Sequence, residues 1–396
     1  MAKAELLKEL QSGYSRFNFV GKAKIREGAF GGVTQKDGST WRQVNSSFGV
    51  DSGEGNVAYG RIWGGYKTDK PIIKARNSEG KFIDVDWHKR NDEEYLKNLD
   101  LKENELYRAG IERDEDNKLI IKQFVHAIDF EEYLAEHLHD GQEIRVSGEG
   151  NYNEYNDNIN LQYNVKTVFS NDPYEKDGEI KQTPYMAQLR QTYLVDSDSL
   201  DKNWERALEK DGEIIVAVYA PQYLGSKKVG DKYVPVGKNV AYRQAIKVKA
   251  DTEDDTELGK KKQIIKKLFT VKKNVVREVG LIIDINEGYE ESKGVELNDE
   301  MRELIEMGML TEEDIKNQTT IRGNRISELV YNTPIVRKTD GGLVLQLEDK
   351  YAPEVLYPPI IEEDEEDTVK GMFENDDSDE GIDGISDDAF ADLFGE

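Results

Sequence analysis

The chain has 396 residues, no cysteine and a formal net charge of −26. Its length allows two or three domains, and the lack of cysteine excludes disulfides and thiolate metal sites. A chain this acidic does not coat nucleic acid through its net charge, so any nucleic-acid site must be a local groove.

Residues 1–15 are predicted to form an N-terminal helical arm. Leu6, Leu7 and Leu10 fall at helical spacing, and Gly13 would end the helix. The apolar stripe fits packing on the body of the chain or on a neighbouring subunit. The oligomeric state therefore stays open.

From Arg16 the apolar spacing changes to period two, which is typical of strands. One strand face carries Phe17, Phe19, Gly21, Ala23 and Ile25. Residues 40–50 and 56–66 are predicted to be two further strands around the hairpin turn at 51–55. A loop is expected over residues 100–116 and a short helix over 130–138.

The clearest pattern begins at Gly141. Ile144 and Val146 alternate with polar residues, and after a turn Ile159, Leu161 and Tyr163 do the same, which predicts a hairpin with one buried face. The section GQEIRVSGEGNYNEYNDNINLQYNVKTVF resembles the end of the OB fold in single-stranded DNA-binding proteins. This resemblance covers about residues 16–170 and implies an OB-like, single-stranded DNA-binding domain there.

A polar, turn-rich stretch at 170–184 predicts a boundary, and residues 185–360 are predicted to form a second β-rich domain with helices. Strands are expected at 189–195 and 213–219, a hairpin at 232–250, and strands at 262–270 and 275–286. Helices are expected at 200–208 and 296–316. The fold class is mainly β (α+β), and a second OB barrel stays open.

Residues 362–396 form an acidic tail with sixteen acidic residues and one lysine, a formal charge of −15. Such a segment is expected to be disordered. Its apolar tip resembles the tails with which replication proteins that coat single-stranded DNA recruit partners. The tip departs from the bacterial pattern because Gly395 and Glu396 follow Phe394, which favours a phage replication or recombination protein. The predicted partner-binding residues are Phe390, Leu393 and Phe394.

Single strands are held by rings that stack on bases and by cations that follow phosphates. The predicted DNA-binding residues in the first domain are Trp41, Tyr59, Arg61, Trp63 and Tyr66, together with Tyr152 and Tyr155 in the later hairpin. On a strand Tyr59, Arg61 and Trp63 share one face. The alternative is that the tryptophans belong to the core and the tyrosines are structural.

Residues 226–278 hold fifteen Lys or Arg against seven Asp or Glu. Their densest part supplies the remaining predicted DNA contacts: Lys260, Lys261, Lys262, Lys266 and Lys267. A track for phosphates is one interpretation, and a solvated lysine-rich face is the other.

The sequence predicts no enzyme, because it lacks a Walker phosphate loop and a Gly-x-Ser-x-Gly motif. No cofactor or metal is expected. No run approaches the roughly 18 apolar residues of a membrane span, and the first residues lack a signal-peptide core, so a soluble cytoplasmic protein is expected, in the host cytoplasm if phage-encoded. The alternatives to DNA binding are an acidic protein-interaction or DNA-mimic factor and a virion component.

Overall fold

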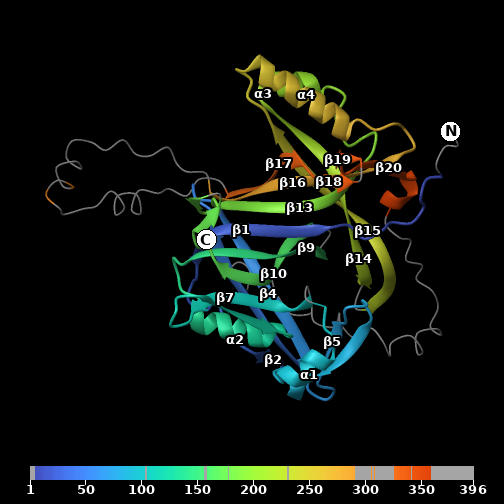
Figure 1. The fold of residues 1–396 in the computed structure, drawn as a ribbon. Helices are drawn as coiled ribbons and strands as arrows, with labels where there is room; N and C mark the ends of the chain where they lie inside the picture. The colour runs from blue at the N-terminus through green and yellow to red at the C-terminus, as the bar shows by residue number, and fades with distance from the viewer. Residues whose placement is uncertain are drawn as a thin grey trace, which may run out of the picture.

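The computed structural model describes residues 5–102, 105–155, 158–176, 178–229, 232–289, 325–339 and 341–357, together with residues 305 and 307. The described chain is mainly β (Figure 1). This confirms the fold class predicted from the sequence. The acidic tail and most of the helix predicted at 296–316 lie outside the described residues.

The first barrel, barrel one, is built from β1 (Ser15–Lys24), β3 (Trp41–Asp51), β4 (Val57–Lys67), β9 (Glu143–Tyr155) and β10 (Asn158–Ser170). Each strand pairs with two others in the order β1-β3-β4-β10-β9 and back to β1. The pairing of β4 with β10 is parallel, with Asn164 beside Arg61, and the others are antiparallel. A closed, five-stranded barrel of this kind is the OB architecture.

An insertion between β4 and β9 covers one end of barrel one. It contains β5 (Ile72–Arg76), β6 (Phe82–Asp86), η1 (Trp87–Lys89), α1 (Glu93–Asn98), β7 (Tyr107–Arg113), β8 (Leu119–Phe124) and α2 (Ala127–His137). Helix α2 packs on β4 at Gly64, where an added methyl group would lie 2.8 Å from the Ala127 Cβ. The short β2 (Thr34–Gln35) pairs with β3.

Barrel two repeats this pairing order. Its strands are β13 (Met186–Val195), β14 (Glu213–Val229), β15 (Lys232–Lys249), β16 (Val276–Tyr289) and β17 (Arg325–Pro334). They pair in the order β13-β14-β15-β17-β16 and back to β13, and β15 with β17 is again the parallel pair. The described chain therefore contains two OB-like barrels, which the sequence had left open.

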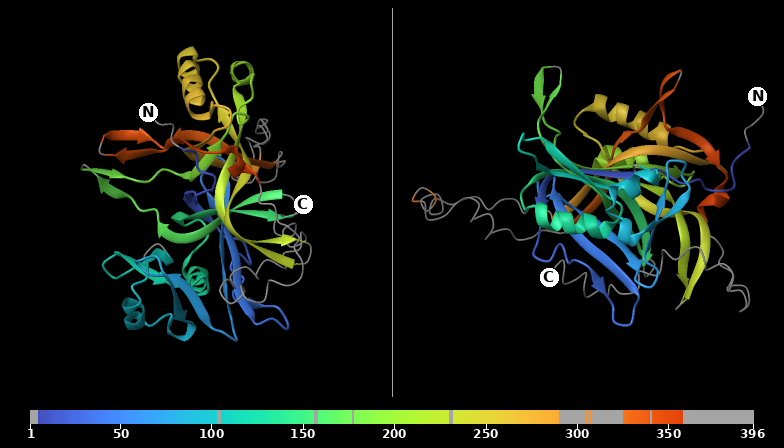
Figure 2. Two further views of the ribbon diagram at one scale, coloured as in Figure 1. Left: turned by 90° about the vertical axis from the view of Figure 1, so that its right-hand side faces the viewer. Right: turned by 60° about the horizontal axis from the view of Figure 1, so that its bottom comes forward.

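The remaining described elements lie around barrel two or project from the barrels. They are β11 (Tyr174–Lys176), β12 (Glu179–Lys181), α3 (Trp204–Asp211), α4 (Asp255–Phe269), β18 (Val336–Thr339), β19 (Gly342–Leu345), β20 (Leu347–Tyr351) and η3 (Pro353–Leu356). The long β14–β15 hairpin, yellow in Figure 2, reaches the β9–β10 hairpin. There the Gln222 side chain exchanges two hydrogen bonds with the Tyr152 backbone.

The two barrels join through their first strands. β1 and β13 pair antiparallel, with Phe17 opposite Leu189, and they lie side by side at the seam in Figure 1. The division of the chain into two domains stays a prediction, because this pairing makes one sheet of both regions.

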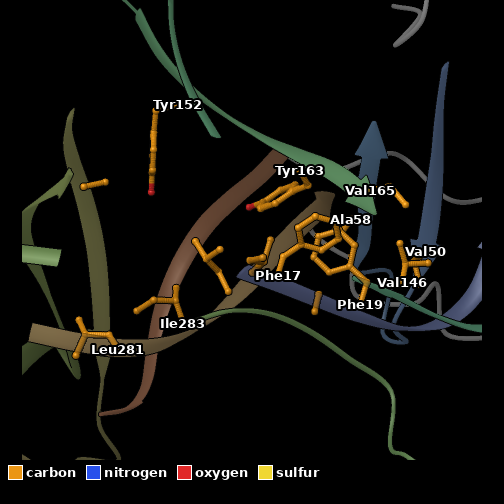
Figure 3. Close-up of a cluster of buried hydrophobic side chains, with 14 of the residues drawn as sticks. Phe17, Phe19, Val50, Ala58, Val146, Tyr152, Tyr163, Val165, Leu281 and Ile283 are labelled. Atoms are coloured by element: carbon orange, nitrogen blue, oxygen red, sulfur yellow. The ribbon is translucent and has the colours of Figure 1, made fainter. Parts of the chain in front are cut away.

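One aromatic cluster anchors the barrel-one core at that seam. Phe17 and Phe19 are 1% and 0% exposed, as their shared strand face predicted. Their ring centroids lie 4.5 Å apart, and Tyr163 lies 5.4 Å from Phe17 and 5.1 Å from Phe19 in edge contacts. Figure 3 shows the three rings pointing toward one another. Such pairs add to the stability that burial alone supplies.

Several local predictions are wrong. Residues 5–14 hold no helix, because Leu7 bonds the β20 end instead, donating to Lys350 O and accepting from Ala352 N. In the predicted strand at 262–270, residues 262–269 belong to α4 instead, and Thr270 is its C-cap. The expected loop at 100–116 contains β7, and the expected hairpin at 232–250 is one strand, β15, paired with β14 along its length.

His126 gives the fold a pH dependence. Its Nδ1 accepts from Ile128 N at 3.2 Å and its Nε2 lies 3.1 Å from Gly65 O, so the neutral ring caps α2. Burial lowers the pKa of His126 from its ordinary value of 6.5. The unfolded chain therefore binds this proton more readily, and the free energy of unfolding is expected to fall as pH drops below about 6.5.

Urea denaturation at a series of pH values measures this effect. The variant His126→Gln should lose part of the decrease that the unmodified chain shows between about pH 7 and pH 5. If the free energy of unfolding falls equally with decreasing pH in the unmodified chain and in His126→Gln, His126 is not the source of the pH dependence.

Candidate nucleic-acid interface

The outer face of β3 and β4 carries the row that the sequence predicted. Ala58 and Ile62 point into the barrel and are fully buried, while Tyr59, Arg61 and Trp63 lie on the opposite face and are half-buried. Register places Asn45 beside Trp63 and Gln43 beside Gly65. We call this surface the Arg61 face; it comprises Trp41, Gln43, Asn45, Tyr59, Arg61, Trp63 and Gln162.

Arg61 sits at the centre of this face between two amide side chains. Its Nε donates to Asn45 Oδ1 and its Nη1 to Gln162 Oε1, both at 2.8 Å. The guanidinium carbon lies 5.9 Å from the Trp63 ring centroid, within the range of a cation–π contact. Side chains from three strands, β3, β4 and β10, therefore hold Arg61 in one orientation.

The charge of Arg61 is not balanced by a carboxylate. Among the described residues no Asp or Glu lies within 4 Å of its nitrogen atoms. Burial lowers the pKa of the guanidinium from its ordinary value, yet arginine stays charged at neutral pH. Beside it on β10, the buried Asn164 Oδ1 has no hydrogen-bond partner in the described chain. A partly desolvated cation with only neutral partners favours an anionic ligand.

Two glycines let aromatic rings lie across the face. A methyl group added at Gly65 would meet the Trp41 ring at 2.6 Å, and one at Gly49 would meet the Tyr59 ring at 3.3 Å. Trp41 Nε1 also donates to Gln43 Oε1 at 3.0 Å, and Arg26 lies 5.5 Å from the Tyr59 ring. The rings are therefore fixed in place while remaining partly exposed.

Tyr66 and Tyr152 do not belong to the interface. Tyr66 has the opposite parity on β4, is 9% exposed and stacks on Trp87 at 3.7 Å. Tyr152 is 4% exposed, donates from its hydroxyl to Gln191 Oε1 and stacks on Tyr242 at 5.9 Å. A ring packed in the core cannot stack on a base, so both predictions are wrong.

The lysines predicted to follow phosphates lie elsewhere. Figures 1 and 2 place α4 at the opposite end of the molecule from β3 and β4, so these lysines do not continue the Arg61 face. Lys262 pairs with Glu209, and Lys261 lies 5.1 Å from the Tyr331 ring centroid. Lys260, Lys266 and Lys267 are exposed, as a solvated lysine-rich face would have them.

Four residues at the site were missed from the sequence, and one of them is Gln43, which accepts a hydrogen bond from Trp41. Asn45, Gln162 and Arg26 touch Arg61 or Tyr59. Counting outward from the turn at 51–55 would have paired Asn45 with Arg61, to which it is hydrogen-bonded, although the strand register sets it opposite Trp63. The parallel contact that brings Gln162 to Arg61 has no local signal. The side chain of Tyr155, and all of Phe390, Leu393 and Phe394, lie outside the described residues.

No group of three or more His, Asp or Glu in the described parts is placed to hold a metal ion. None of the described helices has the length and apolar character to cross a membrane.

The sequence matches no protein-family model, and no curated protein matches it. Among solved structures, a deletion mutant of the single-stranded DNA binding protein from Thermus aquaticus is similar. It is 10% identical, with a TM-score of 0.27, and the match covers 70% of this chain and 88% of that chain. A likeness this weak carries neither a fold nor a function, and the barrels above are assigned from strand pairing alone.

Proposed function

We propose that this chain binds single-stranded DNA, without sequence preference, through the Arg61 face. The observation that supports this most is Arg61 itself, a half-buried cation held by two amides and flanked by aromatic rings. A phosphate would supply the missing negative charge, and Trp41, Tyr59 and Trp63 would stack on neighbouring bases. Each stacked base contributes about 1–3 kcal/mol.

The position of the face supports the same function. β3 and β4 are the second and third strands of barrel one, and OB barrels use that surface for oligonucleotides. The negative net charge of the chain does not argue against such a site. Base stacking and one oriented guanidinium can bind a single strand without a basic protein. Binding that relies on few phosphates is expected to depend only weakly on salt.

A titration of the full chain with a dT oligomer tests the proposal. Binding should quench tryptophan fluorescence, since Trp41 and Trp63 lie on the face, and log K should fall with log salt with a shallow slope. A chain that shows neither quenching nor a mobility shift at micromolar concentration does not have this function.

The second candidate is an acidic protein-interaction or DNA-mimic factor. The net charge of −26 favours it, because carboxylates can imitate phosphates. Such a factor would gain nothing from a cation and rings on an open face. A silent DNA titration is the result that would favour it.

We further propose a role in phage replication or recombination, in the host cytoplasm, with the acidic tail recruiting partner proteins. Replacing Phe390, Leu393 and Phe394 by Ala together should abolish co-purification of replication or recombination proteins with the tagged chain. Because these residues are far in sequence from the Arg61 face, the affinity for DNA should not change. Mass spectrometry that finds the same retained proteins with both chains would contradict this role.

A further inference from the structure

Barrel two carries a different surface at the position that corresponds to the Arg61 face. On β14 and β15 the outward pairs are Ile215 with Lys247, Ala217 with Ala245, and Tyr219 with Arg243. Lys247 is tied to Glu328 at 2.6 Å and Glu213 at 3.2 Å. The two central alanines leave a smooth floor between the Tyr219–Arg243 pair and the Ile215–Lys247 pair. This face is therefore suited to an apolar segment.

The end of the described chain already lies on this surface. Leu356 in η3 and Leu10 near the N-terminus pack against the same small cluster as Tyr219 and Ala241. Tyr357 directly follows Leu356, so the described chain ends next to the cluster that holds Tyr219. The chain thus leaves the described structure beside the alanine floor.

The floor continues as an open groove with a volume of about 480 Å³, whose lining includes Ile159, Ile215, Ala217, Arg243 and Ala245. Ile159 comes from the β10 end of barrel one, so both barrels contribute. Ile215 is 65% exposed, a high value for an isoleucine in the middle of a long strand. Arg243 is exposed and has no carboxylate within 4 Å among the described residues.

The sequence after Tyr357 is Pro358-Pro359-Ile360-Ile361-Glu362-Glu363. We propose that Ile360 and Ile361 occupy the groove over Ala217 and Ala245, and that Glu362 or Glu363 pairs with Arg243. The reach is sufficient. Three extended residues span about 10 Å, whereas Ala217 is two strand positions, about 6.6 Å, from Tyr219.

This docking would cover the β14–β15 face of barrel two with a segment of the same chain. It would also hold the first residues of the acidic tail against barrel two. The inference stands on the groove and on the course of the chain, and it does not depend on DNA binding by the Arg61 face.

Disulfide trapping in the full chain tests this inference, because the chain has no cysteine of its own. The probe pair is Ala245→Cys, which lies on the outward side of β15 and lines the groove, with Ile361→Cys. The matched control is Gln263→Cys, on the exposed surface of α4, with the same Ile361→Cys. The groove pair should form an intramolecular disulfide at least about tenfold faster than the control, because docking raises the effective concentration.

A third chain adds Ile215→Asp to the groove pair. Since Ile215 is largely exposed, this change should leave the far-ultraviolet circular dichroism unchanged while slowing the disulfide to the control rate. Equal rates for the groove and control pairs, no effect of Ile215→Asp, or a disulfide that links two chains would each overturn the inference.

Discussion

Trp63→Ala should weaken binding of a dT oligomer by about 1–3 kcal/mol, since it removes one stacking ring from the Arg61 face. Trp63 is half-buried on the outer side of β4, and its ring lies beside the Arg61 guanidinium. The loss should therefore include the cation–π contact that orients Arg61. Fluorescence anisotropy with a labelled oligomer measures the dissociation constant without relying on the tryptophan that is removed.

Phe82→Ala is the matched control for this experiment. Phe82 is an aromatic residue that is 70% exposed on β6 and is not among the residues that define the Arg61 face, so its removal should leave the affinity unchanged. Arg61→Gln provides a second arm: it should weaken binding and reduce the salt slope by about one unit. An unchanged dissociation constant for Trp63→Ala in a folded chain would remove Trp63 from the interface.

Phe19→Ala should lower the free energy of unfolding by about 3–5 kcal/mol, because it leaves a cavity in the barrel-one core. Phe19 is 0% exposed and contacts the rings of Phe17 and Tyr163. The cavity would open near the seam where β1 pairs with β13, so both barrels should lose stability together. Urea denaturation monitored by circular dichroism gives the change.

The exposed phenylalanine again supplies the comparison, since surface substitutions usually change stability by no more than about 0.5 kcal/mol. Phe82→Ala should therefore unfold close to the unmodified chain. A loss under about 1 kcal/mol for Phe19→Ala would show that the aromatic cluster is not the centre of the fold.

Period-two spacing of apolar residues correctly predicted those strands of barrel one that have one buried face and one solvent-exposed face. The alternation at Phe17, Phe19 and Ala23 identified β1, and the alternation at Ile159, Leu161 and Tyr163 identified β10, because each strand buries one face. The same parity placed Tyr59, Arg61 and Trp63 on the outer face. Tyr66 was assigned to the interface because it is aromatic. Its position on β4 has the same parity as Ala58 and Ile62, which places its side chain in the core.

Helix α4 shows why the second half of the chain was harder to predict. Its apolar residues include Ile264, Ile265 and Phe269, which favour strands in isolation. The helix signals were Asp254, which accepts from two backbone amides as the N-cap, and the helical spacing of Leu258, Ile265 and Leu268. Tertiary packing decides between these two local preferences.

The long-range pairings had no signal in the sequence. The parallel contact of β15 with β17 joins Lys247 to Val330, more than eighty positions apart, and the second barrel has no visible sequence repeat of the first. The N-terminal arm carries a leucine pattern, but Leu7 instead bridges to Tyr351, near the C-terminal end of the described residues. Such contacts depend on how the whole chain folds.

Ultraviolet cross-linking of a dT oligomer to the full chain, with the adducts located by mass spectrometry, tests the central claim most directly. We expect adducts at Trp41, Tyr59 or Trp63 on the Arg61 face, and we expect them to be lost when Arg61→Gln weakens binding. Adducts confined to α4 or to the β14–β15 hairpin, with none on β3 or β4, would contradict it.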